Sequence, residues 1–177
     1  MKKAIDIFFI ILIFFVIYFL QVNFFTWFNI AGIMPNLFII LIMMIGLFMK
    51  KDFGFFFGIL FGLMLDIFIG TRIGINAITF AIVGLVSGYL DKNFSKDNRM
   101  TVMLMTMLIT IVAELITYIL KISFCGATFE IASFIKIVLI EMVYNAILII
   151  IFYPIFFSFG NKLEQDFINN NSFLKFF

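Results

Sequence analysis

The segment from Lys50 to Gly74 reads KKDFGFFFGILFGLMLDIFIGTRIG, and the spacing of its small residues decides the interpretation of the whole chain. From its first glycine onward, every fourth residue is a glycine or an aspartate: Gly54, Gly58, Gly62, Asp66, Gly70 and Gly74. A step of four residues on an α-helix advances about 400°, so these positions share one slowly winding face. The segment therefore predicts a helix with a narrow stripe of small residues among bulky apolar ones.

In a membrane, a stripe of this kind favours close packing of helices. Apolar side chains gain little by leaving lipid for one another, whereas small residues let a second backbone approach closely enough for strong dispersion contacts. Gly54 to Gly62 is therefore predicted to be a packing face. Asp66 differs, because a carboxylate at the bilayer centre costs about 2.5–3.5 kcal/mol on insertion scales. We expect Asp66 to be neutralised within a helix seam, and an intramembrane ligand or ion site is the alternative.

The overall composition is that of a protein that crosses a membrane several times. Of the 177 residues, 65% are hydrophobic and 12% are charged, and the mean hydropathy is +1.24. These values are far from those of a soluble domain, and no polar segment is long enough to form a core of its own. An α-helix makes its backbone hydrogen bonds within itself, as lipid requires, so we expect an all-α membrane protein.

The residue types that most catalytic and metal sites need are missing. There is no histidine, and Cys125 is the only cysteine, which excludes an intrachain disulfide and a zinc site built from thiolates or imidazoles. The sequence also lacks P-loop, G-x-S-x-G, HExxH and CxxC motifs. We therefore predict a protein that is not an enzyme and has no cofactor. Its scattered lysines suit anionic membrane lipids and do not indicate nucleic-acid binding.

Apolar runs predict six membrane spans in a single bundle that fills residues 1–160. The spans lie at about residues 5–22, 35–49, 53–69, 75–90, 100–120 and 131–157, and a cytoplasmic tail follows at 161–177. The second span rises only about 21 Å, so it begins before Pro35, tilts little or is partly shielded from lipid. A very short turn makes it an antiparallel neighbour of the third. Pro154 should kink or end the last span, and the tail is either an interfacial helix or disordered.

Three of the spans carry patterns that predict their neighbours. The 75–90 span has its own small-residue face and is the expected partner of the glycine stripe: Ala77, Ala81, Gly84 and Gly88. The 100–120 span has a polar face: Thr106, Thr110, Glu114, Thr117 and Lys121. In the last span, Glu141 and Asn145 share a face at a spacing of four. We expect Glu114, Glu141 and Asn145 to be buried polar residues.

The distribution of lysine and arginine predicts the orientation in the membrane. One set of ends and connections holds most of the cations: Lys2, Lys3, Lys50, Lys51, Lys92, Lys96, Arg99, Lys162 and Lys175. The other set holds Arg72 and Lys121, so the positive-inside rule places both termini in the cytoplasm. Three acids and three cations then fall at matching depth: Asp66, Glu114, Glu141, Arg72, Lys121 and Lys136. We expect these groups to neutralise one another, and a proton or substrate pathway is the alternative.

Several motifs also occur in a distinctive order along the chain. Pro35-Asn36-Leu37 opens the second span, a short basic turn follows, and a GxxxGxxxGLxxDxxxGxxxG block runs from Gly54 to Gly74. Gly88-Tyr89-Leu90 ends the next helix, and the segment from Asn145 to Pro154 completes the pattern. This combination resembles the MreD family of bacterial rod shape-determining membrane proteins over nearly the whole chain. Asn36 departs from the aspartate expected in many relatives, which weakens any role for a charge there.

The resemblance implies a multi-pass protein of the bacterial cytoplasmic (inner) membrane that belongs to the elongation machinery. Its expected function is that of a non-enzymatic scaffold that controls rod shape and peptidoglycan insertion by binding MreC. Through MreC the expected partners are the actin-like MreB, RodA and a penicillin-binding transpeptidase. The resemblance also implies a fold similar to the S components of energy-coupling-factor transporters, so a substrate-binding subunit of a vitamin transporter is the alternative function. A small enzyme acting on lipid is a third.

Overall fold

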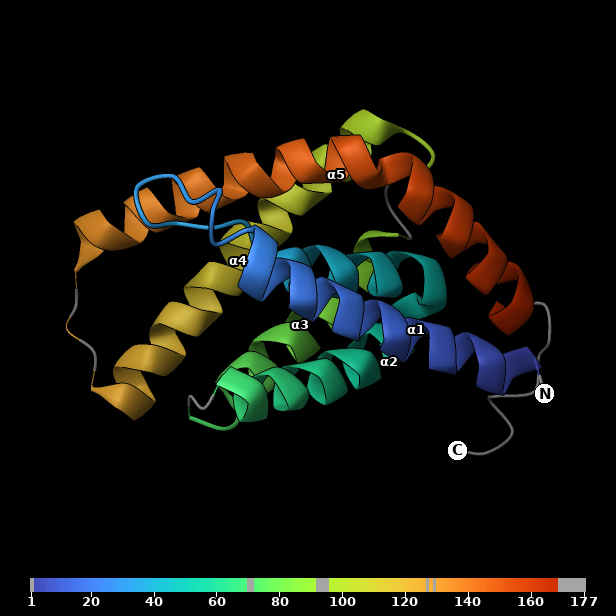
Figure 1. Ribbon diagram of the computed structural model, residues 1–177, viewed down its shortest axis with the longest axis horizontal. Helices are drawn as coiled ribbons and strands as arrows, with labels where there is room; N and C mark the ends of the chain where they lie inside the picture. The colour runs from blue at the N-terminus through green and yellow to red at the C-terminus, as the bar shows by residue number, and fades with distance from the viewer. Residues whose placement is uncertain (1, 70–71, 92–95, 127, 129, 169–177) are drawn as a thin grey trace.

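The protein is built from helices, with no β-strand, in the part of the chain that its computed structural model describes, residues 2–69, 72–91, 96–126, 128 and 130–168 (Figure 1). The helices are α1 (Lys2–Phe19), α2 (Leu37–Ile69), α3 (Ile75–Leu90), α4 (Arg99–Cys125) and α5 (Ile131–Ile168), and a π-helical turn, Leu20–Phe24, extends α1. Four stretches are long and apolar enough to cross a membrane: Ile7–Phe24, Leu37–Ile69, Arg99–Cys125 and Ile131–Lys162. The predicted all-α membrane class is confirmed.

Helix α2 is broken at Lys50 and folds back on itself. Lys50 has φ 73° and ψ 163°, which is not a helical conformation, and it divides α2 into a first arm, residues 37–49, and a second arm, residues 51–69. The Phe14 ring lies 5.4 Å from the Phe38 ring of the first arm and 4.6 Å from the Phe61 ring of the second. In a straight helix Phe38 and Phe61 would be about 35 Å apart. The two arms therefore lie side by side, as the short turn between them predicted.

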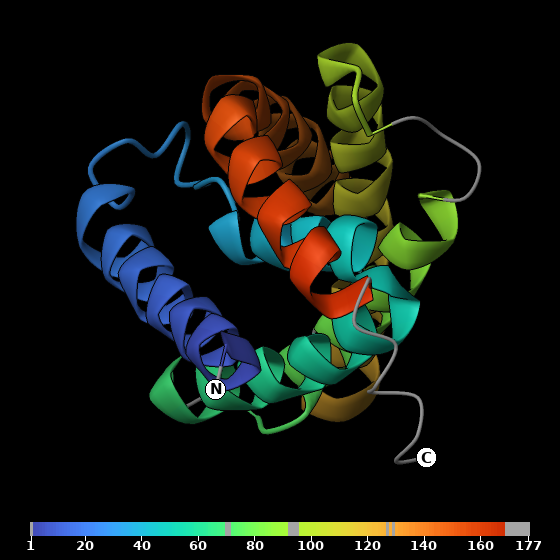
Figure 2. The same ribbon diagram turned by 90° about the vertical axis from the view of Figure 1, so that its right-hand side faces the viewer.

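The first arm of α2 is the central helix of the protein. Every one of its residues is buried, and Figure 2 shows it surrounded by the other helices. Contacts link it to all four of them: Phe38 with Phe14 of α1 and Phe80 of α3, Met43 with Thr106 of α4, and Phe48 with Phe157 of α5. A helix that is apolar all round belongs in an interior. The short length of this arm is therefore explained, because other helices and not lipid cover it.

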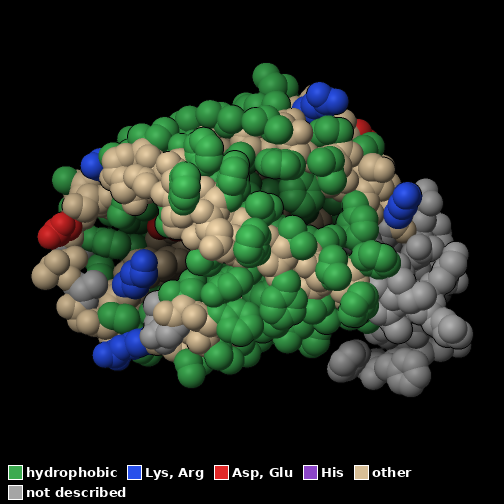
Figure 3. All heavy atoms as spheres, viewed as in Figure 1, with side chains coloured by type: hydrophobic (Ala, Val, Ile, Leu, Met, Phe, Trp, Pro, Cys, Tyr) green, Lys and Arg blue, Asp and Glu red, His purple; other side chains and the backbone are tan. Residues whose placement is uncertain are grey.

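The outer helices turn large apolar side chains outward. Exposed hydrophobic residues follow α5 at every fourth position: Ile131, Ile135, Leu139, Val143, Ile147, Ile151 and Ile155. Figure 3 shows hydrophobic side chains over most of the visible face, with the charged ones gathered mainly towards its two ends. This surface suits a lipid environment between two polar boundaries.

Two helices extend beyond the membrane spans predicted for them. Helix α4 does not stop near residue 120 but continues to Cys125. Gly126 then ends the helix: it adopts a left-handed conformation, φ 62°, and its N–H donates to the Lys121 carbonyl. Helix α5 contains Pro154 and runs through to Ile168, so the start of the expected tail is helical. Figure 1 shows that α5 bends along its length, which agrees with the kink that a proline causes by removing one backbone hydrogen bond.

Replacing Lys50 by glycine should stabilise the protein. A side chain at φ 73° and ψ 163° is strained, and such a conformation costs a residue other than glycine about 1–3 kcal/mol. We expect Lys50→Gly to raise the free energy of unfolding by about 1 kcal/mol. The measurement is equilibrium unfolding in detergent followed by loss of helical circular dichroism. Lys51→Gly is the matched control, and it should destabilise because Lys51 begins the second arm in a helical conformation. Equal effects of both substitutions would contradict the argument.

Candidate functional site

The second arm of α2 packs against α3 at backbone distance, and glycines make this approach possible. A Cβ atom added at Gly54 would lie 2.6 Å from the carbonyl oxygen of Gly84. An added Cβ at Gly58 would collide with the backbone of Phe80, and one at Gly62 with the backbone of Ala77. The collisions involve main-chain atoms, which cannot rotate away as a side chain can. These three glycines of the stripe therefore all lie in the contact with α3.

The same contact includes a glycine that the sequence pattern did not single out. A Cβ at Gly46, in the first arm, would lie 2.6 Å from the same Gly84 oxygen, so both arms of α2 meet α3 at one point. At Gly88 an added Cβ would collide with the backbone of Lys51. Gly46 was missed because it is separated from the glycine stripe by the break at Lys50. We call the contact formed by Gly46, Gly54, Gly58, Gly62, Gly84 and Gly88 the glycine seam.

The last member of the predicted stripe, Gly74, does not extend the seam. Gly70 lies outside the described residues. Gly74 has φ 110° and no atom within 4 Å of the place where a Cβ would be, so a packing role is wrong for it. It sits at the N-terminus of α3 and adopts a left-handed conformation that favours glycine. Its role is to turn the chain into α3.

Asp66 closes the end of the seam by binding the N-terminus of α3. Its completely buried carboxylate accepts hydrogen bonds from the backbone N–H groups of Gly74 (2.8 Å), Asn76 (3.2 Å) and Ala77 (3.4 Å). A fourth comes from Asn76 Nδ2, at 2.8 Å. The first N–H groups of a helix have no partner within it, and the helix dipole favours negative charge there. Since Gly74 has no side chain to cap α3, Asp66 supplies the cap from the preceding helix.

The expectation that Asp66 is neutralised by a cation is wrong. Both ion pairs found among the described residues belong to Lys96, and the side chains of Arg72 and Lys136 are exposed. Four N–H donors already satisfy the Asp66 carboxylate, so it has no need of a cation at membrane depth. One feature of the sequence could have indicated this arrangement. Asp66 and Gly74 are only eight residues apart, so the short connection between the two helices keeps the acid near the start of α3.

Asn145 is a buried link between three helices. It is completely buried; its Oδ1 accepts the N–H of Asn36 at 2.9 Å, and its Nδ2 donates to Thr110 Oγ1 at 3.1 Å. Asn36 in turn caps the first arm of α2 by accepting the N–H of Ile39. The predicted buried position of Asn145 thus has a specific geometry: it ties α5 to α4 and to the start of the central arm.

Glu141 lies one turn before Asn145 and is not satisfied in the same way. It is 5% exposed, and its Oε1 has no hydrogen-bond partner in the described part of the chain. Glu114 and Lys121 of α4 lie next to it, so this part of the predicted acid and cation cluster does come together. Glu114 is half-buried and Lys121 is exposed.

Glu141 also lines a cavity of about 330 Å³ at the end of the bundle where α2 and α3 are joined. Apolar and polar residues share its wall, among them Phe38, Leu65, Ile137, Gln21, Asn36 and Asn76. Figure 3 shows the surface hollowed at this end of the molecule. The volume falls at the lower end of the range for small-molecule sites, whose walls are mostly apolar with a few polar groups. No cluster of three metal-ligating side chains exists among the residues described.

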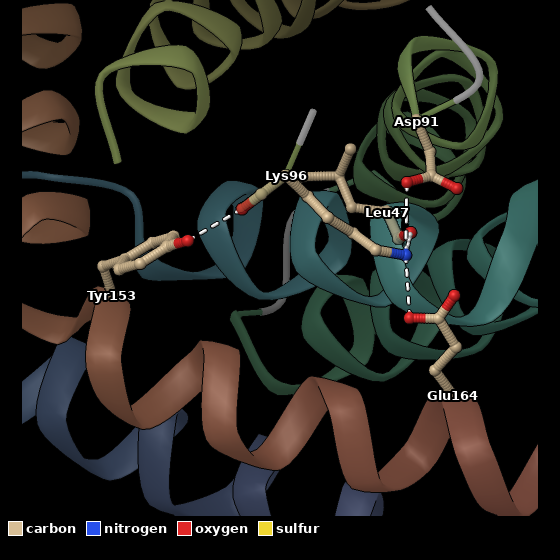
Figure 4. Close-up of polar contacts among 5 residues, drawn as sticks. All are labelled: Leu47, Asp91, Lys96, Tyr153 and Glu164. Atoms are coloured by element: carbon tan, nitrogen blue, oxygen red, sulfur yellow. Dashed lines mark hydrogen bonds and ion pairs between the residues drawn. The ribbon is translucent and has the colours of Figure 1, made fainter. Parts of the chain in front are cut away.

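A second polar cluster lies at the opposite end of the bundle and was not predicted from the sequence. Lys96 Nζ lies 2.8 Å from Glu164 and 3.2 Å from Asp91, and it donates to the Leu47 carbonyl at the end of the first arm (Figure 4). The Lys96 carbonyl accepts the hydroxyl of Tyr153. Lys96 therefore joins the loop before α4 to α2 and to both halves of α5. The partners of Lys96 are far apart in sequence, so no local sequence pattern predicts this cluster.

Adding a single methyl group in the glycine seam should be severely destabilising. Gly58→Ala places a Cβ against the main chain of Phe80, and we expect the free energy of unfolding to fall by about 3 kcal/mol, the upper end of the range for overpacking. Thermal unfolding in detergent measures it. Phe56→Ala is the control, because Phe56 lies two residues away and is 60% exposed. An unchanged melting temperature of Gly58→Ala would refute the close approach.

Removing the charge of Asp66 should uncap α3. Asp66→Asn keeps the size but replaces one acceptor oxygen by a donor that faces backbone N–H groups. Because hydrogen bonds to charged groups contribute about 1.5–3 kcal/mol, we expect a loss of stability of about 2 kcal/mol and faster amide hydrogen exchange at Asn76 and Ala77. Asp52→Asn, at an exposed aspartate of the same arm, should change neither. Unaltered exchange in Asp66→Asn would argue against the cap.

Comparison with known proteins gives one match, to a family model. The model, described as rod shape-determining protein MreD, matches residues 2–163, a range that contains the glycine seam, Asp66 and the Glu141 cavity. No curated protein and no solved structure matches the chain. Together with its apolar helices, the match over most of its 177 residues makes this multi-pass membrane protein a member of the MreD family of rod shape-determining proteins.

Proposed function

We propose that this protein is a non-enzymatic scaffold of the bacterial elongation machinery in the cytoplasmic membrane. The observation that carries the proposal is the family match, which extends over almost the entire helical bundle. The geometry supports a structural role, because the polar clusters around Asp66 and Lys96 hold helices and loops of the chain together. Neither contains a nucleophile next to a base, the arrangement that covalent catalysis requires.

We further propose six crossings of the membrane with both termini in the cytoplasm. The crossings are α1, the two arms of α2, α3, α4 and α5. Three features support this orientation: α1 begins and α5 ends at one end of the molecule, the break of α2 at Lys50 lies at that same end, and α3 begins at the other (Figure 1). The positive-inside rule assigns the lysine-rich end to the cytoplasm. The cavity at Glu141 then faces the outer side.

The proposed partner is an MreC-like membrane protein, and through it MreB, RodA and a penicillin-binding transpeptidase. The exposed apolar stripes of the outer helices support such contacts, since a helix in lipid can pack against a partner helix as readily as against acyl chains. The likeness to the S components of vitamin transporters is an implication of the family resemblance alone. The comparisons lend no support to a transporter subunit, and we do not propose it.

Depletion of the protein in its own host tests this function. We expect cells to become round and new peptidoglycan to be inserted at dispersed sites, both visible by fluorescence microscopy. Re-expression of the natural chain should restore shape, Phe56→Ala should do so equally, and Gly58→Ala should fail. Affinity purification from restored cells should recover the MreC-like protein of the same host. Rod shape that persists after depletion, with wall insertion unchanged, would contradict the proposal.

A further inference from the structure

The cavity lined by Glu141 is the place in the described structure where a buried carboxyl group keeps one oxygen without a hydrogen-bond partner. At 5% exposure, Glu141 keeps an Oε1 without a hydrogen bond, although an unmet acceptor in an apolar interior is costly. Ionisable side chains inside membranes are retained where they serve a site. The adjoining space of about 330 Å³ is large enough for a ligand group. These observations point to a bound molecule that the protein chain itself does not supply.

The hydrogen-bonding groups of the wall define the chemistry of this molecule. Both polar atoms of Gln21 already have a partner in the chain, since its Nε2 donates to the Pro35 carbonyl and its Oε1 accepts the Leu37 N–H. Asn76 uses Nδ2 on Asp66, which leaves its Oδ1 as an acceptor beside that of Glu141. Asn36 uses Oδ1 on Ile39, which leaves its Nδ2 as a donor. The free positions therefore call for a ligand with hydrogen-bond donors and a nearby oxygen.

Acidic side chains outnumber basic ones next to the cavity. Glu114 and Glu141 face each other between α4 and α5, and Lys121 is the one cation next to them. The carboxylate of Asp66 lies on the other side of Asn76 and already accepts hydrogen bonds from backbone N–H groups. Arg72 and Lys136 are exposed. Two carboxyl groups thus stand beside one ammonium group, and the N–H donors of a cationic ligand would bond to the carboxyl oxygens.

We propose that this cavity binds a primary ammonium group that has an oxygen atom a few bonds away, the chemistry of an ethanolamine group. Its N–H donors would meet Glu141 and Asn76, its oxygen would meet Asn36, and the apolar wall would cover the carbon atoms between them. Two sources offer this chemistry: the headgroup of phosphatidylethanolamine in the surrounding membrane, and a small amino alcohol free in solution. This site does not depend on the scaffold proposal, because it follows from the cavity and its polar groups alone.

Ligand binding can be tested on the full chain in lipid nanodiscs. Ethanolamine is titrated into protein held in phosphatidylcholine nanodiscs, and the melting temperature is read from the loss of helical circular dichroism. A bound ligand stabilises the folded state, so we expect a saturable rise. Choline, whose methylated nitrogen has no N–H donors, should bind at least about tenfold more weakly, as expected when charge-assisted hydrogen bonds are lost.

Two cavity variants and one control variant test whether ethanolamine binds at Glu141. Glu141→Gln should weaken ethanolamine binding at least about tenfold, whereas Glu130→Gln, at an exposed glutamate just before α5, should bind as the natural chain does. Ile137→Trp, which fills the cavity without changing a charge, should also abolish the response and decides the matter if Glu141→Gln does not fold.

Nanodiscs of phosphatidylethanolamine distinguish the two sources. If they raise the melting temperature and remove the response to ethanolamine, the lipid headgroup is the ligand; an unchanged response identifies the free amine. No saturable rise with either, or equal binding by Glu141→Gln and the natural chain, would overturn the proposal.

Discussion

The approach of two backbones at the glycine seam is the constraint on which the rest of this structure depends. Gly54, Gly58 and Gly62 bring the second arm of α2 against α3 so closely that no Cβ atom fits between them. Only at this distance can the carboxylate of Asp66 reach the first N–H groups of α3. The cap and the seam therefore reinforce each other: the seam positions the carboxylate, and the carboxylate fixes the end of the helix that completes the seam.

The seam also explains how a short helix can occupy the middle of a membrane protein. The first arm of α2 is too short to span the hydrocarbon core comfortably, but every one of its residues is covered by other helices. Gly46 brings it to the same point of α3 as the second arm, and Asn145 holds its start. At its other end, Lys96 binds the Leu47 carbonyl. Lipid thus contacts the surrounding helices while the centre is fixed by polar contacts at both ends.

The features that could be predicted from the sequence are those that depend on local spacing. The four-residue repeat indicated the contact between the glycine stripe and the face with Gly84 and Gly88, and the order of motifs identified the family. What could not be predicted depends on residues that only folding brings together. Three of the four partners of Asp66 are backbone N–H groups, which a pattern of side chains does not reveal. Lys96 and Glu164 are distant in sequence, and the passage of Pro154 through a continuous helix depends on neighbours that hold both halves of α5.

Asp66 and Glu141 show why two acids at membrane depth need different explanations. Burial alone does not separate them, since one is completely buried and the other nearly so. The difference lies in their hydrogen bonds. Asp66 accepts three from backbone N–H groups at the start of α3 and one from the Asn76 side chain. Glu141 has one oxygen without a hydrogen bond, and it lines the cavity. A satisfied carboxylate is accounted for by the stability of the fold. An unsatisfied one lowers that stability, so its presence beside a cavity is better explained by a ligand than by packing.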